Sequence, residues 1–342
     1  MLTKIKGFLP GRDGARGVLD YVLAASAVYA IIIVVLMVLF DHEPAQFDVR
    51  EVTARRMPTA DGTPVRGATT TAAMVEVIDR LLHKRGGYLT NDVVPPGILM
   101  DNVPNWEWGA LVQTRDLAIA LRNDLARSQS QSTEDPNLVK ADNKLRIDSE
   151  SWMFPAAEDE YTEASEALAV YLNHISNPGS QQAQFYARAD NLRNWLAVVE
   201  KRLGDLSQRL SASVGQVRIN TDLAGESGAE QSTQGPDVLV VQTPWLEIDD
   251  VFYEARGASW ALLHFLRAVE QDFASVLDKR NALVSLRQLI RELESTQDII
   301  WSPVVLNGEG FGFVANHSLV MASYISRANA AVIDLRMLLE RG

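Results

Sequence analysis

The feature that most constrains this chain is an uninterrupted apolar run, YVLAASAVYAIIIVVLMVLF, from Tyr21 to Phe40. It holds no charged residue, no Gly and no Pro, and its only polar side chains are the hydroxyls of two tyrosines and a serine. As a helix the run is roughly 30 Å long, which is the thickness of the hydrocarbon core of a bilayer. Lipid offers backbone amides no partner, so such a run crosses a membrane only as a helix. We predict a transmembrane helix over residues 18–40.

A cleaved signal and a soluble core helix both fit the run less well. A cleaved secretory signal has an apolar core of about 7 to 15 residues that ends at a small-residue site. Here Phe40 is followed at once by the polar sequence DHEP, and the small residues Ala25 to Ala27 lie inside the run. A buried core helix would need protein around its whole circumference. We therefore expect a permanent anchor.

The flanks of the run predict its orientation. The preceding residues carry four basic and two acidic side chains, whereas the following segment DHEPAQFD carries three acidic ones. Short basic segments stay in the cytoplasm. We therefore expect residues 1–17 to form a cytoplasmic tail and the chain after Phe40 to lie in the periplasm, with the protein in the inner membrane of a bacterium.

Composition narrows the function of the exported part. Residues 1–40 have two more basic than acidic side chains, so the net charge of −12 leaves −14 on the remainder. That charge argues against nucleic acid as a partner. The absence of cysteine removes disulfides, thiolate zinc sites and a cysteine nucleophile. The five histidines show no metal-ligand spacing and no phosphate-loop motif is complete, so we predict no cofactor and no metal.

Periodicity predicts a mainly α fold. Residues 41–67 are rich in Pro and Gly and are expected to form a stalk or linker, followed by a periplasmic domain over 68–342. Apolar residues recur in alternating steps of three and four along 185–210, from Thr243-Pro244 onward with a break near 279–281, and from a cap near Asn316 to the end. The expected architecture is an antiparallel bundle of long, heptad-patterned helices.

Two β-like interruptions are expected between these helices. Residues 304–314 contain Asn307-Gly308, which suits the tight turn of a hairpin. Residues 214–220 and 237–242 form a second possible pair. They flank a low-complexity segment, 221–236, that we predict to be a mobile loop.

Tryptophan gives the sharpest candidate for an interaction site. The sequence NWEWG places Trp106 and Trp108 around Glu107 at a loop-to-helix junction, and Trp152 lies in a second loop, SESWMFP. Tryptophan stacks on sugar rings and is favoured in protein interfaces. A spacing of two keeps Trp106 and Trp108 off a common helix face, so two arrangements stay open. Either one ring lies in the core and the other is exposed, or both pack into the start of the bundle, and the same core position is open to Trp152.

Acidic clusters are the only candidates for catalysis. Paired carboxylates perform acid and base chemistry in glycosidases when one lies in an apolar pocket. Both clusters occur at predicted helix starts, where the helix dipole explains them more simply. Their members are Glu158, Asp159 and Glu160, and Glu247, Asp249 and Asp250.

Small residues mark one face of the membrane helix. Ala24, Ala27 and Ala30, together with Ser26, would allow close packing against another helix in the membrane, although GxxxG is absent. An ordinary lipid-facing anchor also accounts for them.

The chain resembles a known family along nearly its whole length. The apolar run followed by LMDNVPNWEWGALVQTRDLAIALRNDLARSQSQSTEDPNL and SWMFPAAEDEY is similar to the bacterial membrane proteins grouped as domain of unknown function 2333. The resemblance implies a proteobacterial inner-membrane protein and assigns no functional residue.

Three functions remain open at this point. The first is a non-enzymatic, membrane-anchored periplasmic protein that scaffolds or contacts a cell-envelope assembly, with a protein partner or a second copy. The second is a binding module for a glycan or small molecule that uses exposed Trp residues. The third is a carboxylate-dependent envelope hydrolase.

Overall fold

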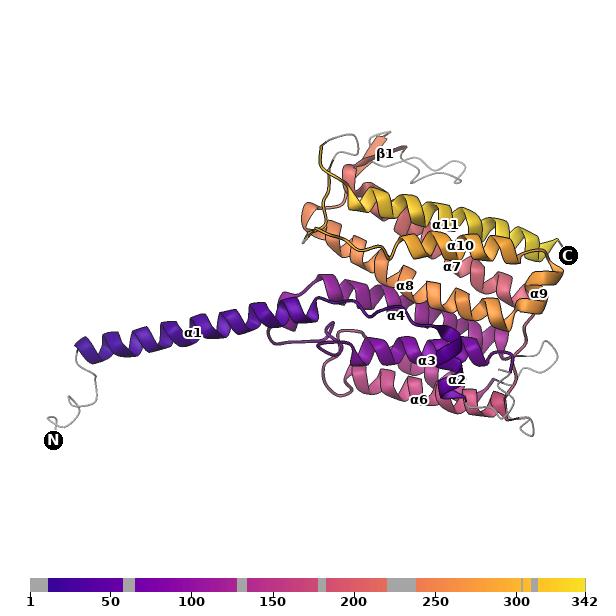
Figure 1. The fold of residues 1–342 in the computed structure, drawn as a ribbon, viewed down its shortest axis with the longest axis horizontal. Coiled ribbons are helices and arrows are strands. Elements are labelled where there is room, and N and C mark those ends of the chain that lie inside the picture. Colours follow the sequence, from indigo (N-terminus) through magenta and orange to yellow (C-terminus); the bar gives the residue numbers. More distant parts are fainter. Residues whose placement is uncertain are drawn as a thin grey trace, which may run out of the picture.

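The computed structural model describes residues 12–57, 65–127, 134–177, 183–219, 238–302, 304–308 and 313–341. The fold is mainly α, as predicted, with one two-stranded antiparallel sheet. A long helix, α1, projects from a domain that the other helices build (Figure 1). The helices are α1 Arg12–Phe40, α2 Val49–Arg56, α3 Ala68–His83, α4 Asn102–Ala120, α5 Pro136–Leu145, α6 Ala157–Ser176, α7 Ala189–Ser211, α8 Ile248–Asp272, α9 Ala274–Lys279, α10 Leu283–Ser295 and α11 His317–Glu340.

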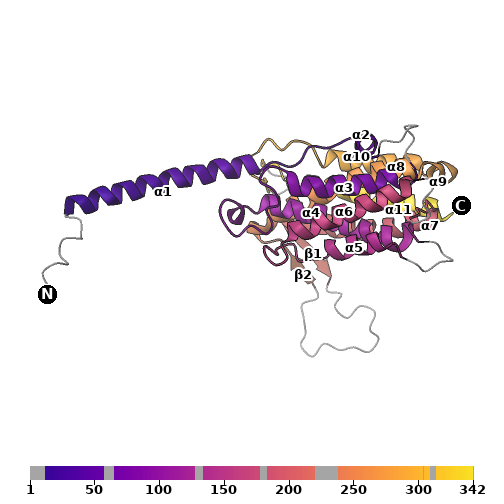
Figure 2. The ribbon, with the colours of Figure 1, turned by 90° about the horizontal axis from the view of Figure 1, so that it is seen from below.

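Helices α4 and α8 form the middle of the domain and pack along each other. Helices α3, α5 and α6 lie on one side of this pair, with α2 against α3. Helices α7, α10 and α11 lie on the other side (Figures 1 and 2). The central helices α4 and α8 run parallel, since Asn105 near the start of α4 donates to Asp250 near the start of α8. The predicted antiparallel arrangement therefore does not hold for this pair. Most other neighbouring long helices run in opposite directions, so the connections gather at two ends of the domain (Figures 1 and 2).

Two glycines allow α4 and α8 to approach closely. A Cβ at Gly109 would lie 2.0 Å from the carbonyl oxygen of Glu254, and a Cβ at Gly257 would lie 1.9 Å from that of Trp106. Both distances are far below van der Waals contact, and the obstacle in each case is backbone. The two central helices therefore pack at this distance only because neither glycine carries a side chain.

The heptad-patterned helices bury their predicted seams. In α7 the apolar residues of the pattern from Leu192 to Leu210 are buried, whereas Ala189 is half-buried and Phe185 precedes the helix. Helix α11 buries its own series against α7 and α10. The predicted cap of α11 is confirmed, since the Asn316 side chain accepts a hydrogen bond of 2.8 Å from the Leu319 N–H. The predicted break is also confirmed: α9 ends at Lys279, Asn281 adopts φ 51°, and α10 begins at Leu283. A second interruption, at Phe273, separates α8 from α9.

The sheet lies where the second strand pair was predicted. Strand β1, Gln216–Ile219, runs antiparallel to β2, Val238–Val241, with Val217 opposite Val240. The predicted mobile loop 221–236 lies outside the described residues.

The hairpin predicted over 304–314 is wrong in the position of its turn. Asn307 forms a bridge with Asn316, and the Gly308 N–H donates to the Ala315 carbonyl at 3.1 Å. Asn307 and Gly308 therefore belong to one arm of a wider loop, because Ala315 and Asn316, just before α11, supply the opposite arm.

The predicted stalk contains a packed element. Within residues 41–67, Asp48 caps the start of α2, and its carboxylate accepts the Arg50 N–H at 2.7 Å. Val49 and Val52 are buried, as are Phe47 before the helix and Met57 after it. This part of the segment belongs to the domain core, because its apolar side chains find a place against α3 and α8.

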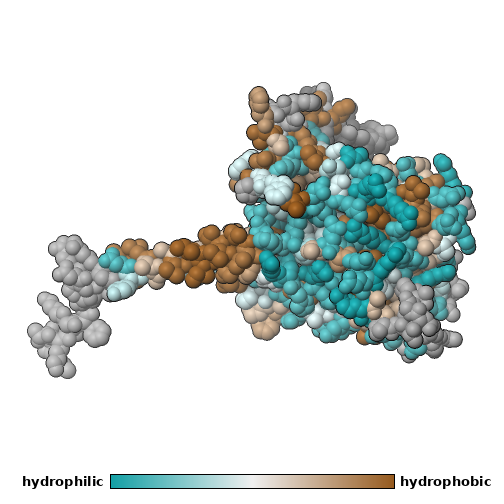
Figure 3. Space-filling model, in the orientation of Figure 1, coloured by the Kyte–Doolittle hydropathy of each residue, from teal (hydrophilic) through white to brown (hydrophobic). Residues whose placement is uncertain are grey.

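The apolar surface of α1 stands apart from the domain. Leu19–Phe40 is long and apolar enough to cross a membrane, and its side chains are mostly exposed. Figure 3 shows this helix as a hydrophobic rod beside a largely hydrophilic domain face. The structure thus supports an N-terminal membrane anchor or signal sequence.

Candidate functional site

The junction between α1 and the domain is densely bonded. The ring of Phe40, the last residue of α1, lies against Gly86 in the loop after α3, where an added Cβ would come within 2.7 Å of the Phe40 Cγ. The following residues then run along α3 and α8 rather than into solvent. Arg80 donates to the Ala45 carbonyl at 3.1 Å, and Arg267 donates to the Gln46 side chain at 3.1 Å.

An arginine of α8 holds the first residues after α1. The Arg256 Nε donates to both carboxylate oxygens of Glu43, at 2.6 and 2.7 Å. Its Nη1 donates to the carbonyls of Thr296 and Asp298, both at 2.9 Å, just beyond α10. Burial raises the pKa of Glu43, and the adjacent guanidinium opposes that rise. Arg256 therefore joins three parts of the chain that meet at the end of the domain.

A buried histidine holds the next residues. The Phe47 N–H donates to His264 Nε2 at 3.0 Å, and His264 Nδ1 lies 2.7 Å from the Trp260 carbonyl. The carbonyl can only accept, so Nδ1 carries the proton and the imidazole is neutral. Burial lowers the pKa of His264 to about 3, despite the bond to Trp260. The Phe47 and His264 rings stack with their centroids 3.9 Å apart. His264 is thus a core residue.

Glu107 forms a buried ion pair. Its carboxylate binds the Lys84 ammonium, and both side chains are almost completely excluded from solvent. It also accepts the N–H groups of Leu89 and Thr90, each at 2.9 Å. Burial raises the pKa of Glu107, whereas Lys84 opposes the rise. Glu107, predicted to contact a partner, instead fixes the loop that touches the end of α1.

The predicted tryptophan pair is divided between core and surface. Trp106 is completely buried and packs against Trp260, with ring centroids 5.1 Å apart, so it cannot contact a partner in this conformation. Trp108 is 36% exposed, and the Arg115 guanidinium lies 5.3 Å from its ring. Trp152 is 53% exposed. Both results for the pair follow from the spacing of two on one helix.

The small residues of α1 lie on its surface. Ala24, Ala27 and Ala30 are exposed in this single chain, in the span that could cross a membrane.

The acidic clusters have polar partners in the structure. Glu158 accepts a hydrogen bond from Asn91 at 2.5 Å, and Glu160 binds Lys144 at 2.7 Å. Asp250 accepts from Asn105 at 2.8 Å. Burial raises the pKa of Asp250 to about 6, and the neighbouring carboxylates, Asp101 first, add to that rise. Within the part of the chain that the structure describes, no three His, Asp or Glu side chains gather as a metal site.

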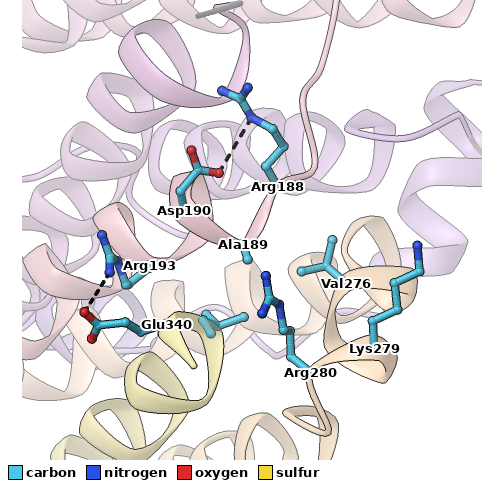
Figure 4. Close-up of a pocket in the computed structure, with 9 residues that line it drawn as sticks. Arg188, Ala189, Asp190, Arg193, Val276, Lys279, Arg280 and Glu340 are labelled. Carbon is cyan, nitrogen blue, oxygen red and sulfur yellow. Dashed lines mark ion pairs between the residues drawn. The ribbon is translucent and has the colours of Figure 1, made fainter. Parts of the chain in front are cut away.

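Two pockets lie at opposite ends of the domain. An apolar pocket of about 380 Å³ is lined by Ile300, Trp301 and Met321 near Arg256. A basic pocket of about 460 Å³ opens between α7, α9 and the end of α11 (Figure 4). Figure 4 shows Arg193 paired with Glu340 and Arg188 paired with Asp190, while Arg280 extends between α9 and the other two helices. Four cationic side chains against two acidic ones suit an anionic partner.

Sequence reasoning missed the residues that build the junction. Glu43 and Arg256 are ordinary charged residues 213 positions apart, and no local pattern marks them. The one signal in the sequence was His264 in an apolar stretch, which indicated a core position without its partner.

Comparisons with known proteins show the family of the chain. No curated protein and no solved structure matches the chain. A family model described as an uncharacterized protein conserved in bacteria matches residues 14–342. The match includes both α1 and the helical domain. The chain therefore belongs to the DUF2333 family of uncharacterized proteins conserved in bacteria.

Proposed function

We propose that this protein is a single-pass inner-membrane protein whose helical domain stands on the periplasmic face and serves as a non-enzymatic scaffold for a cell-envelope assembly. The observation that carries the proposal is the junction. Between Phe40 and Phe47 the chain is bound to α3 and α8 by an ion pair, main-chain hydrogen bonds and a stacked ring. A domain held in this way has a fixed position relative to its anchor.

A fixed position suits a scaffold better than a capture module. A flexible linker lets a domain search the volume around its anchor. Here the domain instead holds its far end at a fixed distance from the end of α1. That distance is set by the length of α8, which has 25 residues and is about 37 Å long. The basic pocket lies at that far end, so an acidic surface of an envelope partner is the proposed contact.

The orientation rests on the basic flank and is tested with single cysteines. The chain has no native cysteine, so Thr3→Cys and Val284→Cys each carry one reactive thiol. Val284 is 79% exposed at the start of α10. A membrane-impermeant maleimide is expected to label Val284→Cys in intact spheroplasts and Thr3→Cys only after lysis. The opposite pattern would reverse the topology.

The scaffold role is tested by photo-crosslinking in native membranes. A photoreactive residue is placed at Arg193 or Lys279 in the basic pocket, with Asn143 on α5 as the matched exposed control. The pocket positions are expected to give the same neighbour repeatedly, identified by mass spectrometry, and Arg280→Glu is expected to reduce that product. A protein that stays monomeric and yields no reproducible neighbour contradicts the proposal.

Exposed tryptophan supports a second candidate, binding of a periplasmic glycan or small molecule. Trp108 and Trp152 remain accessible, and Trp108 carries a guanidinium beside its ring. Cell-wall fragments are then expected to raise the thermal midpoint of the wild type and not that of Trp108→Ala or Trp152→Ala. If no fragment shifts the wild type, this candidate loses its basis.

A further inference from the structure

The exposed aromatic side chains of the domain lie in one region. Among the described residues outside α1, six aromatic side chains are at least 36% exposed. Phe154 and Trp301 are 91% exposed, and Phe313 is fully exposed. All six lie in connections between helices or in the first turns that follow them. They are Trp108, Trp152, Phe154, Trp245, Trp301 and Phe313.

The connections that carry them meet at the end of the domain from which α1 emerges. The loop before α4 is bonded to the loop before α6, where Asn91 donates to the Ser151 carbonyl at 2.9 Å. The first turns of α4 and α8 are joined by Asn105 and Asp250. The loop after α10 is tied to Glu43 through Arg256. In both ribbon views these loops lie level with the end of α1 (Figures 1 and 2).

The opposite end of the domain has a different surface. The start of α7, the α8–α9–α10 connection and the end of α11 meet there and line the basic pocket. Exposed aromatic side chains are absent from the described residues at that end. The exposed aromatic side chains therefore lie at the end of the domain that carries α1, and the basic pocket lies at the opposite end.

We propose that the loops at the α1 end rest in the interfacial region of the same bilayer, with Trp152, Phe154, Trp245, Trp301 and Phe313 as an aromatic rim around the anchor. The proposal rests on α1 being a membrane anchor. Tryptophan gathers at membrane interfaces because its ring is apolar and carries a polar N–H group, and the two Phe side chains add apolar surface beside it. Solvent-exposed patches of this kind on soluble proteins mark an interaction surface. Here the surface continues directly from a helix of membrane-spanning length.

The acidic residues at this end of the domain indicate that its contact with the bilayer is apolar rather than electrostatic. Asp101, Asp249 and Asp250 lie at the same end, at the starts of α4 and α8. Carboxylates are repelled by anionic headgroups, so attraction to anionic lipid does not hold this end at the surface. We therefore expect insertion into zwitterionic phosphatidylcholine at least as deep as into a bilayer rich in phosphatidylglycerol.

The test uses the full chain reconstituted in phosphatidylcholine nanodiscs with single-cysteine variants. Phe154→Cys and Trp301→Cys carry an environment-sensitive fluorophore in the rim. Val34→Cys, 58% exposed on α1, reports on the anchor, and Val284→Cys is the exposed control at the far end. Nitroxide lipids with a shallow or a deep label then act as quenchers.

The expected result is quenching of the two rim probes by the shallow nitroxide, of Val34→Cys by the deep one, and of Val284→Cys by neither. If Val34→Cys is quenched and the rim probes behave like Val284→Cys, the rim proposal is overturned and the anchor stands. If Val34→Cys is unquenched, the anchor itself fails. A rim probe with blue-shifted emission but no quenching lies under protein, such as a second copy, which also overturns the proposal.

A label-free measurement removes the influence of the fluorophore. Brominated lipids quench tryptophan that touches the bilayer, and Trp106, Trp195 and Trp260 are buried in the domain. Replacing Trp152, Trp245 and Trp301 together by Phe is expected to abolish most of the quenchable emission. If the quenched fraction is unchanged by that triple substitution, the rim does not enter the bilayer.

Discussion

Glu43 and Arg256 are 213 residues apart in the chain, and two hydrogen bonds of 2.6 and 2.7 Å join them at the foot of the domain. The same guanidinium binds the carbonyls that end the α10 segment. One side chain therefore connects the residues after α1, the central helix α8 and the α10–α11 connection. Its removal tests whether the domain is held to its anchor.

Arg256→Ala is expected to lower the free energy of unfolding by about 2 to 4 kcal/mol, because it leaves the Glu43 carboxylate and several carbonyls without their partner. Arg256→Lys, which keeps the charge but not the fork of donors, is expected to lose less. Denaturant unfolding of the detergent-solubilised protein measures both. A spin label at Ala45 should become mobile in Arg256→Ala, and an unchanged spectrum would show that Arg256 does not hold the junction.

Gly109→Ala and Gly257→Ala are each expected to destabilise the protein by at least about 2 kcal/mol, because the new methyl group overlaps backbone of the facing helix. Gly204 in α7 is the matched control. A Cβ there would meet only the Asn329 side chain, at 3.6 Å, so Gly204→Ala is expected to stabilise by about 0.5 to 1 kcal/mol through helix propensity. Equal effects at the three positions would contradict the close approach of α4 and α8.

The buried pair of Lys84 and Glu107 is testable by a double-mutant cycle. Lys84→Met leaves a buried carboxylate unpaired and is expected to lower the free energy of unfolding by about 3 to 5 kcal/mol. Lys84→Met/Glu107→Gln removes the unpaired buried charge and keeps one carbonyl oxygen, which at the Oε2 position still accepts the Thr90 N–H, so the double variant is expected to recover part of that loss. Strict additivity of the two substitutions would show that the side chains do not interact.

His264 gives the protein a measurable acid sensitivity. Its pKa is lowered to about 3 in the folded protein and is about 6.5 when unfolded, so between these values the unfolded chain binds the proton and stability falls as the pH falls. The slope is at most about 1.4 kcal/mol per pH unit. Relative to His264→Gln, the wild type is therefore expected to lose about 1 to 2 kcal/mol between about pH 7.5 and about pH 5.

The comparison between the two proteins is essential in that measurement. Burial raises the pKa values of Glu107 and Asp272, which makes the folded protein gain stability on acidification and opposes the histidine. These carboxyls are present in both proteins and cancel in the difference. Parallel pH profiles of wild type and His264→Gln would rule out His264 as the source of the sensitivity.

The helices could be predicted from the sequence because their signals are local. The heptad seam of α7, the Asn316 cap and the break before Leu283 each depend on residues within one or two turns. The predicted start of α8 is wrong by a few residues, since Thr243-Pro244 precedes a short 3₁₀ turn at Trp245–Glu247 and the α-helix begins at Ile248. The loop-to-helix junction expected at NWEWG lies slightly earlier, since α4 begins at Asn102 with Pro104 in its first turn, where a proline needs no amide partner.

The junction could not be predicted because its partners are distant in the chain. Nothing local distinguishes Glu43 from the other acids that follow the apolar run, or Arg256 from any other helix arginine. The Pro and Gly content of residues 41–67 suggests a linker, yet Phe47, Val49 and Val52 fill a surface that only the folded α3 and α8 create. The prediction of Glu107 as a contact residue is wrong because Glu107 is buried in an ion pair with Lys84. This pair has no local signal in the sequence, because Lys84 follows α3 whereas Glu107 belongs to α4.

With α1 as the proposed membrane anchor, the fixed junction would also link the domain to the thickness of the bilayer. The apolar part of α1, Leu19–Phe40, has 22 residues and is about 33 Å long, slightly more than a typical hydrocarbon core. A helix longer than the bilayer tilts, and a thinner bilayer makes it tilt further. Since Phe40 to Phe47 cannot bend freely, each change in tilt must turn the whole domain. Membrane thickness would thereby set the direction in which the basic pocket faces.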